Sequence, residues 1–215
     1  MSGDDVVGLD GRRLRTRRSR EAMSRAAFDL LTEGGLDAIA VEDIAFRAGV
    51  TRRTFSRHFS SIEEAVLGEL DQDVHRFNRA LAARPADESP LLSYRNAVDD
   101  WCAAEFGGGR AAQLAMRWRL FRCFPDEPDL FDSYQRIRTA GQQESVRIIA
   151  TRLGVDPARD PRPSAAVAAG SGLLLAALQA WAVGDDPTGL PAVIDQYFDT
   201  LVELIVEFRN EEPPS

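Results

Sequence analysis

The stretch 41–59, VEDIAFRAGVTRRTFSRHF, constrains the fold of this chain more than any other part of the sequence. Two short amphipathic segments flank Gly49, a residue type that tolerates the positive φ of a tight turn. Small side chains where two helices meet let them cross closely, and here Ala45 and Ala48, just before Gly49, have this role. The pattern predicts a short helix over 41–48 and a following helix that is capped by Thr51 and ends near residue 59.

The side chains predicted to point outward from this second short helix form a polar and cationic face. No acidic residue occurs between Thr51 and Ile62. A helix that enters the major groove of DNA needs such a face, because it meets phosphates and the edges of bases. The candidate DNA-contacting residues are Thr51, Arg52, Arg53, Thr54, Ser56, Arg57 and His58.

Basic residues are concentrated at the front of the chain, and all 26 of them are Arg. Residues 1–60 carry a charge balance of +2 and residues 61–215 one of −10, which together give the formal net charge of −8. An acidic protein with a basic front predicts that only the front meets a polyanion. Residues 1–18 are interpreted as a flexible Arg-rich arm that reaches an adjacent groove, with Arg17 and Arg18 as phosphate contacts. A solvated arm without a partner is the alternative.

Helical periodicity dominates the whole chain and strand patterns are nearly absent, so the predicted fold class is all-α with about nine helices. An apolar helix face at Met23, Ala26, Ala27, Leu30 and Leu31 opens the series and stops at Gly34-Gly35. The predicted domains are the arm (1–18), a helix-turn-helix domain (19–62) and a larger helical domain (63–215). Beyond residue 60, the predicted helices are Ser61–Ala83, Leu91–Phe106, Ala111–Phe124, Leu130–Leu153, Ser164–Val183 and Leu190–Phe208.

Residues 163–184 form an uncharged run of 22 positions, long enough to span a bilayer. Ala, Gly and Ser dominate this run; they supply little transfer energy to lipid but allow helices to pack closely. We therefore predict a buried helix of a bundle and no membrane partner. The first ten residues contain no apolar run typical of a secretory signal, so a cytoplasmic, nucleoid-associated location is expected.

Residues from about Arg17 to Leu67 resemble the TetR/AcrR family of transcriptional regulators. The resemblance rests on three motifs: Glu33-Gly34-Gly35-Leu36-Asp37, then Val41-x-x-Ile44-Ala45-x-x-Ala48-Gly49-Val50, then Thr54-Phe55-x-x-His58-Phe59. It implies a three-helix DNA-binding domain followed by a larger ligand-binding and dimerisation domain, which the remaining helices fit in number and order only. The segment Thr51–Phe55 also resembles a subgroup related to mycofactocin-type regulators.

Carried over by position, the resemblance implies that residues 51–54 lie near base edges and phosphates. It also implies that His58 and the start of the helix after it lie on the phosphate backbone. The sequence departs from the family pattern at three positions. Ser56 stands where Tyr is usual, Ile62 stands where Lys usually meets phosphate, and Ala40 replaces a frequent Thr N-cap.

The function implied by the resemblance is a homodimeric, sequence-specific transcriptional regulator, a repressor that a small apolar effector releases from DNA. Its implied partners are a pseudo-palindromic double-stranded operator, a second copy of the chain and an effector, for which an acyl thioester is one candidate. A helical core needs aromatic residues in any case, and that alternative stays open. The candidate effector-pocket residues, around a hinge at Gly107–Gly109, are Trp101, Phe106, Trp118, Phe121, Tyr134 and Trp181.

The rival hypothesis is an all-α enzyme or scaffold that does not bind DNA. An enzyme needs paired carboxylates, a nucleophile with its base, or metal ligands. The two His and two Cys residues do not stand at metal-ligand spacing, and no HExxH, GxSxG or phosphate-binding Gly-rich motif occurs. We therefore expect no catalytic residues, no metal and no cofactor.

Overall fold

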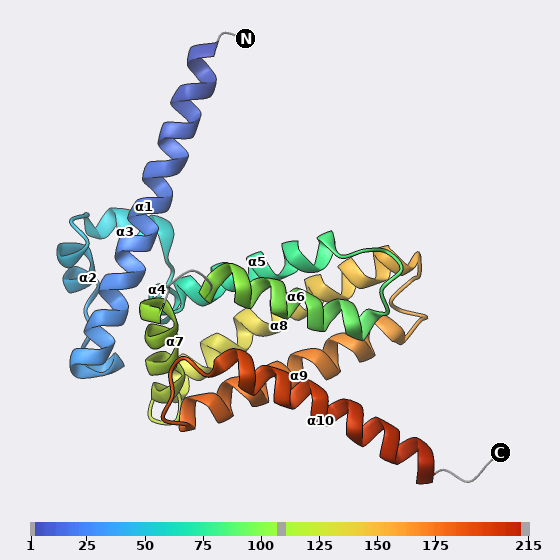
Figure 1. The fold of residues 1–215 in the computed structure, drawn as a ribbon. Coiled ribbons are helices and arrows are strands. Elements are labelled where there is room, and N and C mark those ends of the chain that lie inside the picture. Colours follow the sequence, from blue (N-terminus) through green and yellow to red (C-terminus); the bar gives the residue numbers. More distant parts are fainter. Residues whose placement is uncertain (1–2, 107–110, 212–215) are drawn as a thin grey trace. The chain divides into compact units, whose positions relative to one another are not determined.

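The computed structural model describes residues 3–106 and 111–211, and within these ranges every regular element is a helix (Figure 1). The all-α prediction is confirmed. The predicted hinge at Gly107–Gly109 lies outside the described residues. The elements are α1 (Gly3–Gly34), the 3-10 helix η1 (Leu36–Ala38), α2 (Val41–Arg47), α3 (Arg52–His58), α4 (Ile62–Val66), α5 (Gly68–Ala83), α6 (Pro90–Phe106), α7 (Ala111–Cys123), α8 (Pro128–Leu153), α9 (Arg162–Val183) and α10 (Leu190–Glu211).

The chain forms two compact units. Unit 1 comprises Met1–Asp73 and Pro125–Ile137, and unit 2 comprises Val74–Phe124 and Arg138–Ser215. The boundaries fall inside α5 and α8, whereas the sequence prediction placed the boundary between the helix-turn-helix domain and the larger domain after residue 62. Residues beyond 62 join unit 1 because α4 buries its apolar side chains against α1, with Ala65 fully covered.

Helix α1 is longer than the sequence predicted, because it extends back to Gly3 through most of the expected flexible arm. Residues 12–33 contain no Gly or Pro, and Arg, Ala, Leu and Met are strong helix formers. An ion pair one turn apart, from Arg17 Nε to Glu21 Oε1 at 2.7 Å, adds local support. The predicted apolar face lies in the core, except that Leu30 is only half-buried and Phe28 is buried in addition.

The predicted helix over 61–83 is two helices, α4 and α5, separated at Leu67. Ser61 caps α4 by accepting a hydrogen bond from the Glu64 amide at 3.1 Å, as the sequence predicted. Gly68 opens α5 where the chain passes close to α1: a Cβ at Gly68 would lie 2.2 Å from Ser24 Oγ. The break therefore coincides with a close approach that only glycine accommodates.

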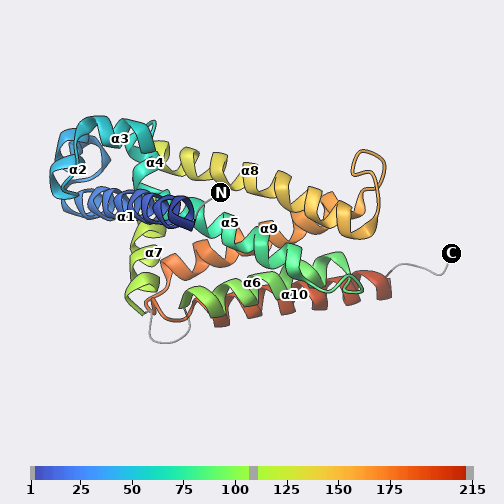
Figure 2. The same cartoon turned by 90° about the horizontal axis from the view of Figure 1, so that it is seen from above.

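In unit 2, helices α6, α7, α9 and α10 pack together. Figure 2 shows α6 and α10 side by side, and Arg95 of α6 joins them through Asp199 at 2.7 Å and Asp195 at 3.1 Å. Gly170 lets α9 approach α6, since a Cβ there would lie 2.4 Å from the Tyr94 ring.

Helix α9 covers the uncharged run at residues 163–184, whose length would also suit a membrane span. It is the one helix in the described ranges with the length and composition to cross a bilayer, and 44% of its most apolar window is buried inside the protein. Core helices of water-soluble bundles pass the same test, so this property is weak support for a membrane span.

Candidate nucleic-acid interface

The turn between α2 and α3 is built by Gly49. Its φ of 66° is left-handed, and the Val50 amide donates to the Ala45 carbonyl at 2.8 Å while the Gly49 amide donates to the Phe46 carbonyl at 3.1 Å. These two bonds form a Schellman motif, which ends a helix and redirects the chain sharply. A Cβ at Gly49 would meet nothing within 4 Å, so the turn needs glycine for its backbone angle rather than for space.

Helix α3 begins with the cap that the sequence predicted. Thr51 Oγ1 accepts a hydrogen bond from the Thr54 amide at 3.1 Å, and the two hydroxyl oxygens lie 3.0 Å apart. The predicted base-contacting threonines therefore bond to each other at the start of the helix. By contrast, Ala40 gives α2 no side-chain cap, as its identity implies.

The apolar side of α3 anchors the helix in the core of unit 1. Phe55 and Phe59 are nearly fully buried, with ring centroids 5.6 Å apart, and they share the core of unit 1 with Ile44 and Met23. The opposite side carries the polar residues predicted for DNA contact: most of them are exposed, whereas Thr54 and His58 are partly buried. The sequence-predicted division of α3 into a buried and a cationic face is thus present in the structure.

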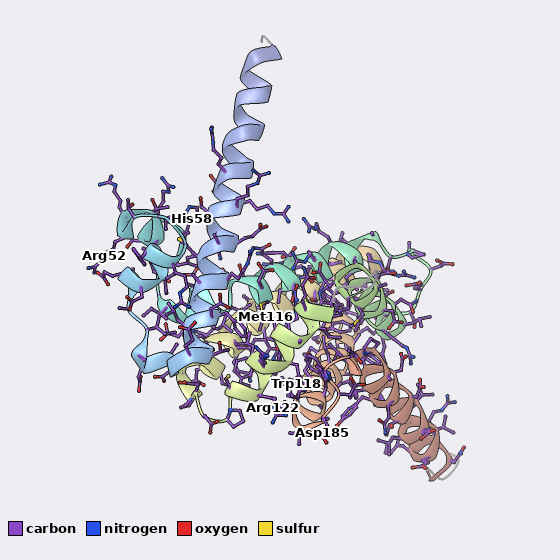
Figure 3. The ribbon with its side chains drawn as sticks, turned by 60° about the vertical axis from the view of Figure 1, so that its left-hand side comes forward. Arg52, His58, Met116, Trp118, Arg122 and Asp185 are labelled. Atoms are coloured by element: carbon purple, nitrogen blue, oxygen red, sulfur yellow. The ribbon has the colours of Figure 1, made fainter. Side chains whose placement is uncertain are left out.

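The three arginines of α3 are held differently. Arg52 Nη1 lies 2.5 Å from Glu42 Oε1 of α2, an ion pair between two exposed side chains. Arg53 and Arg57 are exposed, and neither makes an ion pair within the described part of the chain. Figure 3 shows Arg52 at the outer edge of unit 1. Two guanidinium groups are therefore available to an anion, and a third is pre-positioned by a carboxylate.

Arg20 of α1 anchors the other end of α3. Its Nη1 donates to the His58 carbonyl at 2.6 Å, and its guanidinium lies over the Phe59 ring, 4.3 Å from the centroid. The same group reaches Asp71 at 3.5 Å and Glu64 at 3.7 Å. A cation on the last carbonyls of a helix is favourable because the helix dipole is negative there. Arg20 thus ties α1, α3, α4 and α5 at one point.

His58 lies at the C-terminal end of α3 (Figure 3). Burial lowers its pKa below the usual value of 6.5, and the nearby positive charges of Arg57 and Arg20 lower it further. Its Nε2 atom is buried and has no hydrogen-bond partner within the described residues. The imidazole is therefore neutral at pH 7, and a phosphate contact by this residue would involve a neutral ring or an added proton.

The Arg-rich segment 15–18 of α1 is exposed, as a phosphate-binding surface requires. Arg17 is held by Glu21, whereas Arg18 makes no ion pair within the described ranges. The structure therefore presents these cations from a helix and not from an extended arm.

The six predicted pocket residues fall into separate groups. Trp101 and Phe106 of α6 form an edge-to-face pair at 5.2 Å, and Phe121 of α7 lies 6.5 Å from Trp181 of α9. Tyr134 belongs to unit 1, where its ring lies 6.3 Å from that of Phe131.

Two of the tryptophans have structural hydrogen bonds. Trp118 Nε1 donates to the Trp181 carbonyl at 3.2 Å, and Trp181 Nε1 donates to the Asp186 carbonyl at 3.2 Å. Arg122 stacks over the Trp118 ring and donates to the Ala182 carbonyl at 3.3 Å. Trp118 and Arg122, both labelled in Figure 3, thus provide hydrogen bonds to carbonyl groups at the C-terminal end of α9. These contacts suit the core alternative for both residues.

Three residues of this region were not predicted from the sequence. Arg20 and Glu42 contact α3 from other helices. Glu127, which precedes α8, accepts a hydrogen bond from the Leu36 amide at 2.9 Å and lies beside Gly35. Glu42 had a visible signal, since it is an acidic residue ten positions before an arginine across a tight turn. Arg20 and Glu127 act over 38 and 91 residues and have no local signature.

The comparisons with known proteins agree with this geometry. A family model described as "Bacterial regulatory proteins, tetR family" matches residues 25–67, which contain α2, α3 and their turn. A second, described as "MftR C-terminal domain", matches residues 92–205. Together the two matches cover most of the described residues of both units.

Among curated proteins, the chain is 36% identical over 166 residues to the HTH-type transcriptional regulator TcmR of Streptomyces glaucescens, covering 75% of this chain and 71% of TcmR. Among solved structures, it is similar to NalD of Pseudomonas aeruginosa, the secondary repressor of the MexAB-OprM multidrug efflux pump. That similarity has a TM-score of 0.53 and 21% identity, and it covers 86% of this chain and 96% of NalD.

Proposed function

This chain belongs to the tetR family of bacterial regulatory proteins, and on that premise we propose that it is a homodimeric repressor released from its operator by a small effector. Its membership makes it a DNA-binding transcriptional regulator and not an enzyme. The dimer, the operator contacts, the effector and a cytoplasmic, nucleoid-associated location are the proposed parts.

The observation that carries the proposal is the cationic face of α3 on a rigid base. A Schellman turn, a Thr51 cap and two buried phenylalanines hold the helix, while Arg53 and Arg57 project without an ion pair within the described residues. A recognition helix needs this combination, because base contacts require a fixed backbone and phosphate contacts require accessible cations. The proposed DNA contacts are Arg17, Arg18, Thr51, Arg52, Arg53, Thr54, Ser56, Arg57 and His58.

The second half of α10 supports the proposed dimer. Five apolar side chains lie exposed along it, each between 43% and 64% accessible: Val202, Leu204, Ile205, Val206 and Phe208. A soluble domain rarely leaves such a patch uncovered. Neighbouring α9 presents a stripe of small residues, of which Ala165 and Gly172 are exposed and Ala169 and Ala176 are partly buried. Two copies of α9 and α10 would form a four-helix bundle that covers both surfaces.

One buried donor supports an effector site in unit 2. Trp101 is 8% exposed, and its Nε1 atom has no hydrogen-bond partner within the described residues. A buried donor without a partner costs free energy, so a ligand acceptor that takes its hydrogen bond would stabilise the bound state. Trp101 and Phe106 are therefore the proposed effector contacts with the most support, ahead of Phe121, Trp118, Tyr134 and Trp181. The match to the MftR C-terminal domain supports the mycofactocin-related subgroup, for which an acyl thioester remains the candidate effector.

Binding of a labelled duplex from the region upstream of the chain's own gene tests the proposal. Fluorescence anisotropy should show tight, salt-dependent binding by the wild type, and a variant with Arg52, Arg53 and Arg57 all changed to Ala should lose it. A variant with Arg147 and Arg159 changed to Ala serves as the charge control, because these exposed arginines lie in unit 2. Equal binding by the wild type and the triple variant would overturn the DNA-contact assignment.

A further inference from the structure

The ion pair between Glu42 and Arg52 crosses the turn of the helix-turn-helix. Glu42 stands in the first turn of α2 and Arg52 is the first residue of α3, and the atoms Oε1 and Nη1 lie 2.5 Å apart. The Arg52 side chain is 72% exposed and that of Glu42 is 58% exposed. The pair therefore lies on the accessible face of the DNA-binding unit, beside the residues proposed to meet the groove.

Stability does not account for this pair. Exposed ion pairs contribute little to folding, because water screens the charges and two long side chains lose rotamer freedom. The ion pair does, however, affect the orientation of the Arg52 side chain. One carboxylate contact restricts the guanidinium to a narrow range of orientations and leaves other N–H donors of its planar fork unoccupied.

Arg52 stands where a recognition helix places its specific contacts. The N-terminal residues of such a helix meet base edges in the major groove. The commonest specific contact there is a guanidinium that donates two hydrogen bonds to O6 and N7 of guanine. That geometry depends on the orientation of the fork, whereas a phosphate contact tolerates many orientations.

We infer that Glu42 is a positioning residue that presents Arg52 to the guanine of one G·C pair in each half-site of the operator. This inference rests on the proposed function and adds a specificity determinant to it. Arg53 and Arg57 have no ion-pair partner within the described residues. They provide contacts to DNA that depend less on the orientation of the guanidinium. Glu42 itself does not touch DNA; its carboxylate acts through Arg52.

The opposite role for Glu42 makes a different prediction. If the carboxylate only competed with DNA for Arg52, its removal would strengthen binding to every duplex alike. If it positions Arg52, its removal weakens the preference for G·C at one position and leaves the other positions unchanged. The base preference, and not the overall affinity, therefore separates the two roles.

The chain offers a matched control at the next position. Asp43 is exposed in the same first turn of α2, and it makes no hydrogen bond or ion pair to α3. The variants Glu42→Gln and Asp43→Asn each remove one negative charge from the start of α2. They remove the same favourable interaction with the helix dipole, but only Glu42→Gln removes a charge that is paired with Arg52.

The experiment selects sites for the full-length protein from a randomised double-stranded DNA library and sequences them. Titrations of single-base variants of the selected site then follow for the wild type and for Glu42→Gln, Asp43→Asn, Arg52→Ala and Arg52→Lys. The wild type should select an inverted repeat with one G·C pair per half-site that is preferred by about 5- to 150-fold. Arg52→Ala should abolish that preference because it removes the donors, and Arg52→Lys should reduce it because an ammonium group lacks the rigid planar fork.

Glu42→Gln should reduce the same preference about two- to fivefold, the fold-change that corresponds to one exposed ion pair. Asp43→Asn should leave it unchanged, and Glu42→Gln should have no effect on it in an Arg52→Ala background. A wild type that selects no site would overturn the proposed function itself. A selected site in which no G·C position depends on Arg52, or an equal effect of Glu42→Gln and Asp43→Asn, would overturn this inference alone. Thermal melting of each variant verifies that the comparison is made between folded proteins.

Discussion

At the scale of the residue, the accessible cations of the DNA-binding unit differ in what each one is expected to contact. Arg53 projects from the first turn of α3, whereas Arg18 lies on α1, outside the recognition helix. A guanidinium at the groove contributes to sequence preference, and one on the flank contributes only charge. The two kinds of contact have separable signatures in binding data.

Arg53→Ala should therefore cost about 1–3 kcal/mol of binding free energy on the specific site and much less on random DNA. Arg18→Ala should weaken binding to all sequences alike and reduce the slope of log K against log[salt] by about 0.9, the value for one phosphate. Titrations of both variants at several salt concentrations measure these effects. If Arg53→Ala lowers specific and random binding equally, Arg53 contacts only phosphate.

His58 gives a pH dependence with a defined sign. Its pKa is lowered in the folded protein, first by burial and then by Arg57 and Arg20, so the folded state takes up a proton less readily than the unfolded state. As pH falls below 6.5, the unfolded state binds a proton first and the free energy of unfolding decreases, until pH reaches the lowered pKa.

A phosphate next to His58 would raise this pKa, and DNA binding would then take up a proton. In that case operator affinity should increase as pH falls from 7.5 to 6, and His58→Gln should remove the increase. Operator titrations across this pH range measure it, with thermal melting to confirm that the protein stays folded. An identical pH profile for wild type and variant would show that His58 does not contact phosphate as a protonated imidazolium.

At the scale of the element, the sequence predicted that most helices exist, but it did not predict the boundaries that depend on contacts between distant parts of the chain. Apolar periodicity and the breakers at 34–35 and 49 located α1, α2 and α3, because these signals act over a few residues. The split between α4 and α5 was missed, since Gly68 is required by a contact with Ser24, 44 positions earlier in the chain. The start of α1 was missed because a run of cations has the composition of a solvated arm and also a high helix propensity.

The contact between Gly68 and Ser24 makes a double-mutant prediction. Gly68→Ala alone should destabilise unit 1, because the new Cβ lies 2.2 Å from Ser24 Oγ. Ser24→Ala removes that oxygen, which is buried and has no hydrogen-bond partner within the described residues, and leaves a Cβ at 3.3 Å. The double variant should recover the loss and gain up to about 1 kcal/mol from the better helix former. Urea unfolding of all four proteins gives the coupling energy; an additive result would contradict the contact.

The proposed dimer depends on α9 and α10, and Gly172 provides a direct test. A Cβ at Gly172 would meet nothing within 4 Å, so Gly172→Arg fits the single chain but places a charge in the proposed four-helix bundle. The variant should be a folded monomer or an aggregate by light scattering, with operator binding weakened because two half-sites are no longer linked. Gln143→Arg adds the same charge on the exposed surface of α8 and should remain a dimer. A stable Gly172→Arg dimer would place the interface elsewhere.

At the scale of the whole molecule, two helices belong to both compact units. The boundaries lie inside α5 and α8, so each helix starts among residues that pack with the DNA-binding helices and ends among residues of unit 2. In unit 2, Asn78 of α5 donates to the Gly141 carbonyl of α8 at 3.2 Å and accepts from Ser145 Oγ at 2.7 Å, which fixes the two helices to each other. The sequence predicted only one connecting helix, because a bond over 63 residues has no local signature.

The proposed switch requires that an effector distinguish two states of the dimer, since a ligand with equal affinity for both shifts nothing. A panel of acyl thioesters and the corresponding free acids, screened by thermal shift, supplies the probe. A saturating hit should weaken operator binding about 5- to 150-fold, for a coupling of about 1–3 kcal/mol, and the operator should weaken effector binding by the same factor. Trp101→Phe keeps an aromatic side chain but removes the buried donor, so it should weaken effector binding while leaving affinity for the operator unchanged in the absence of effector. If a ligand raises the melting temperature yet leaves operator affinity unchanged at saturation, the ligand does not act as a switch and the proposed release from the operator is wrong.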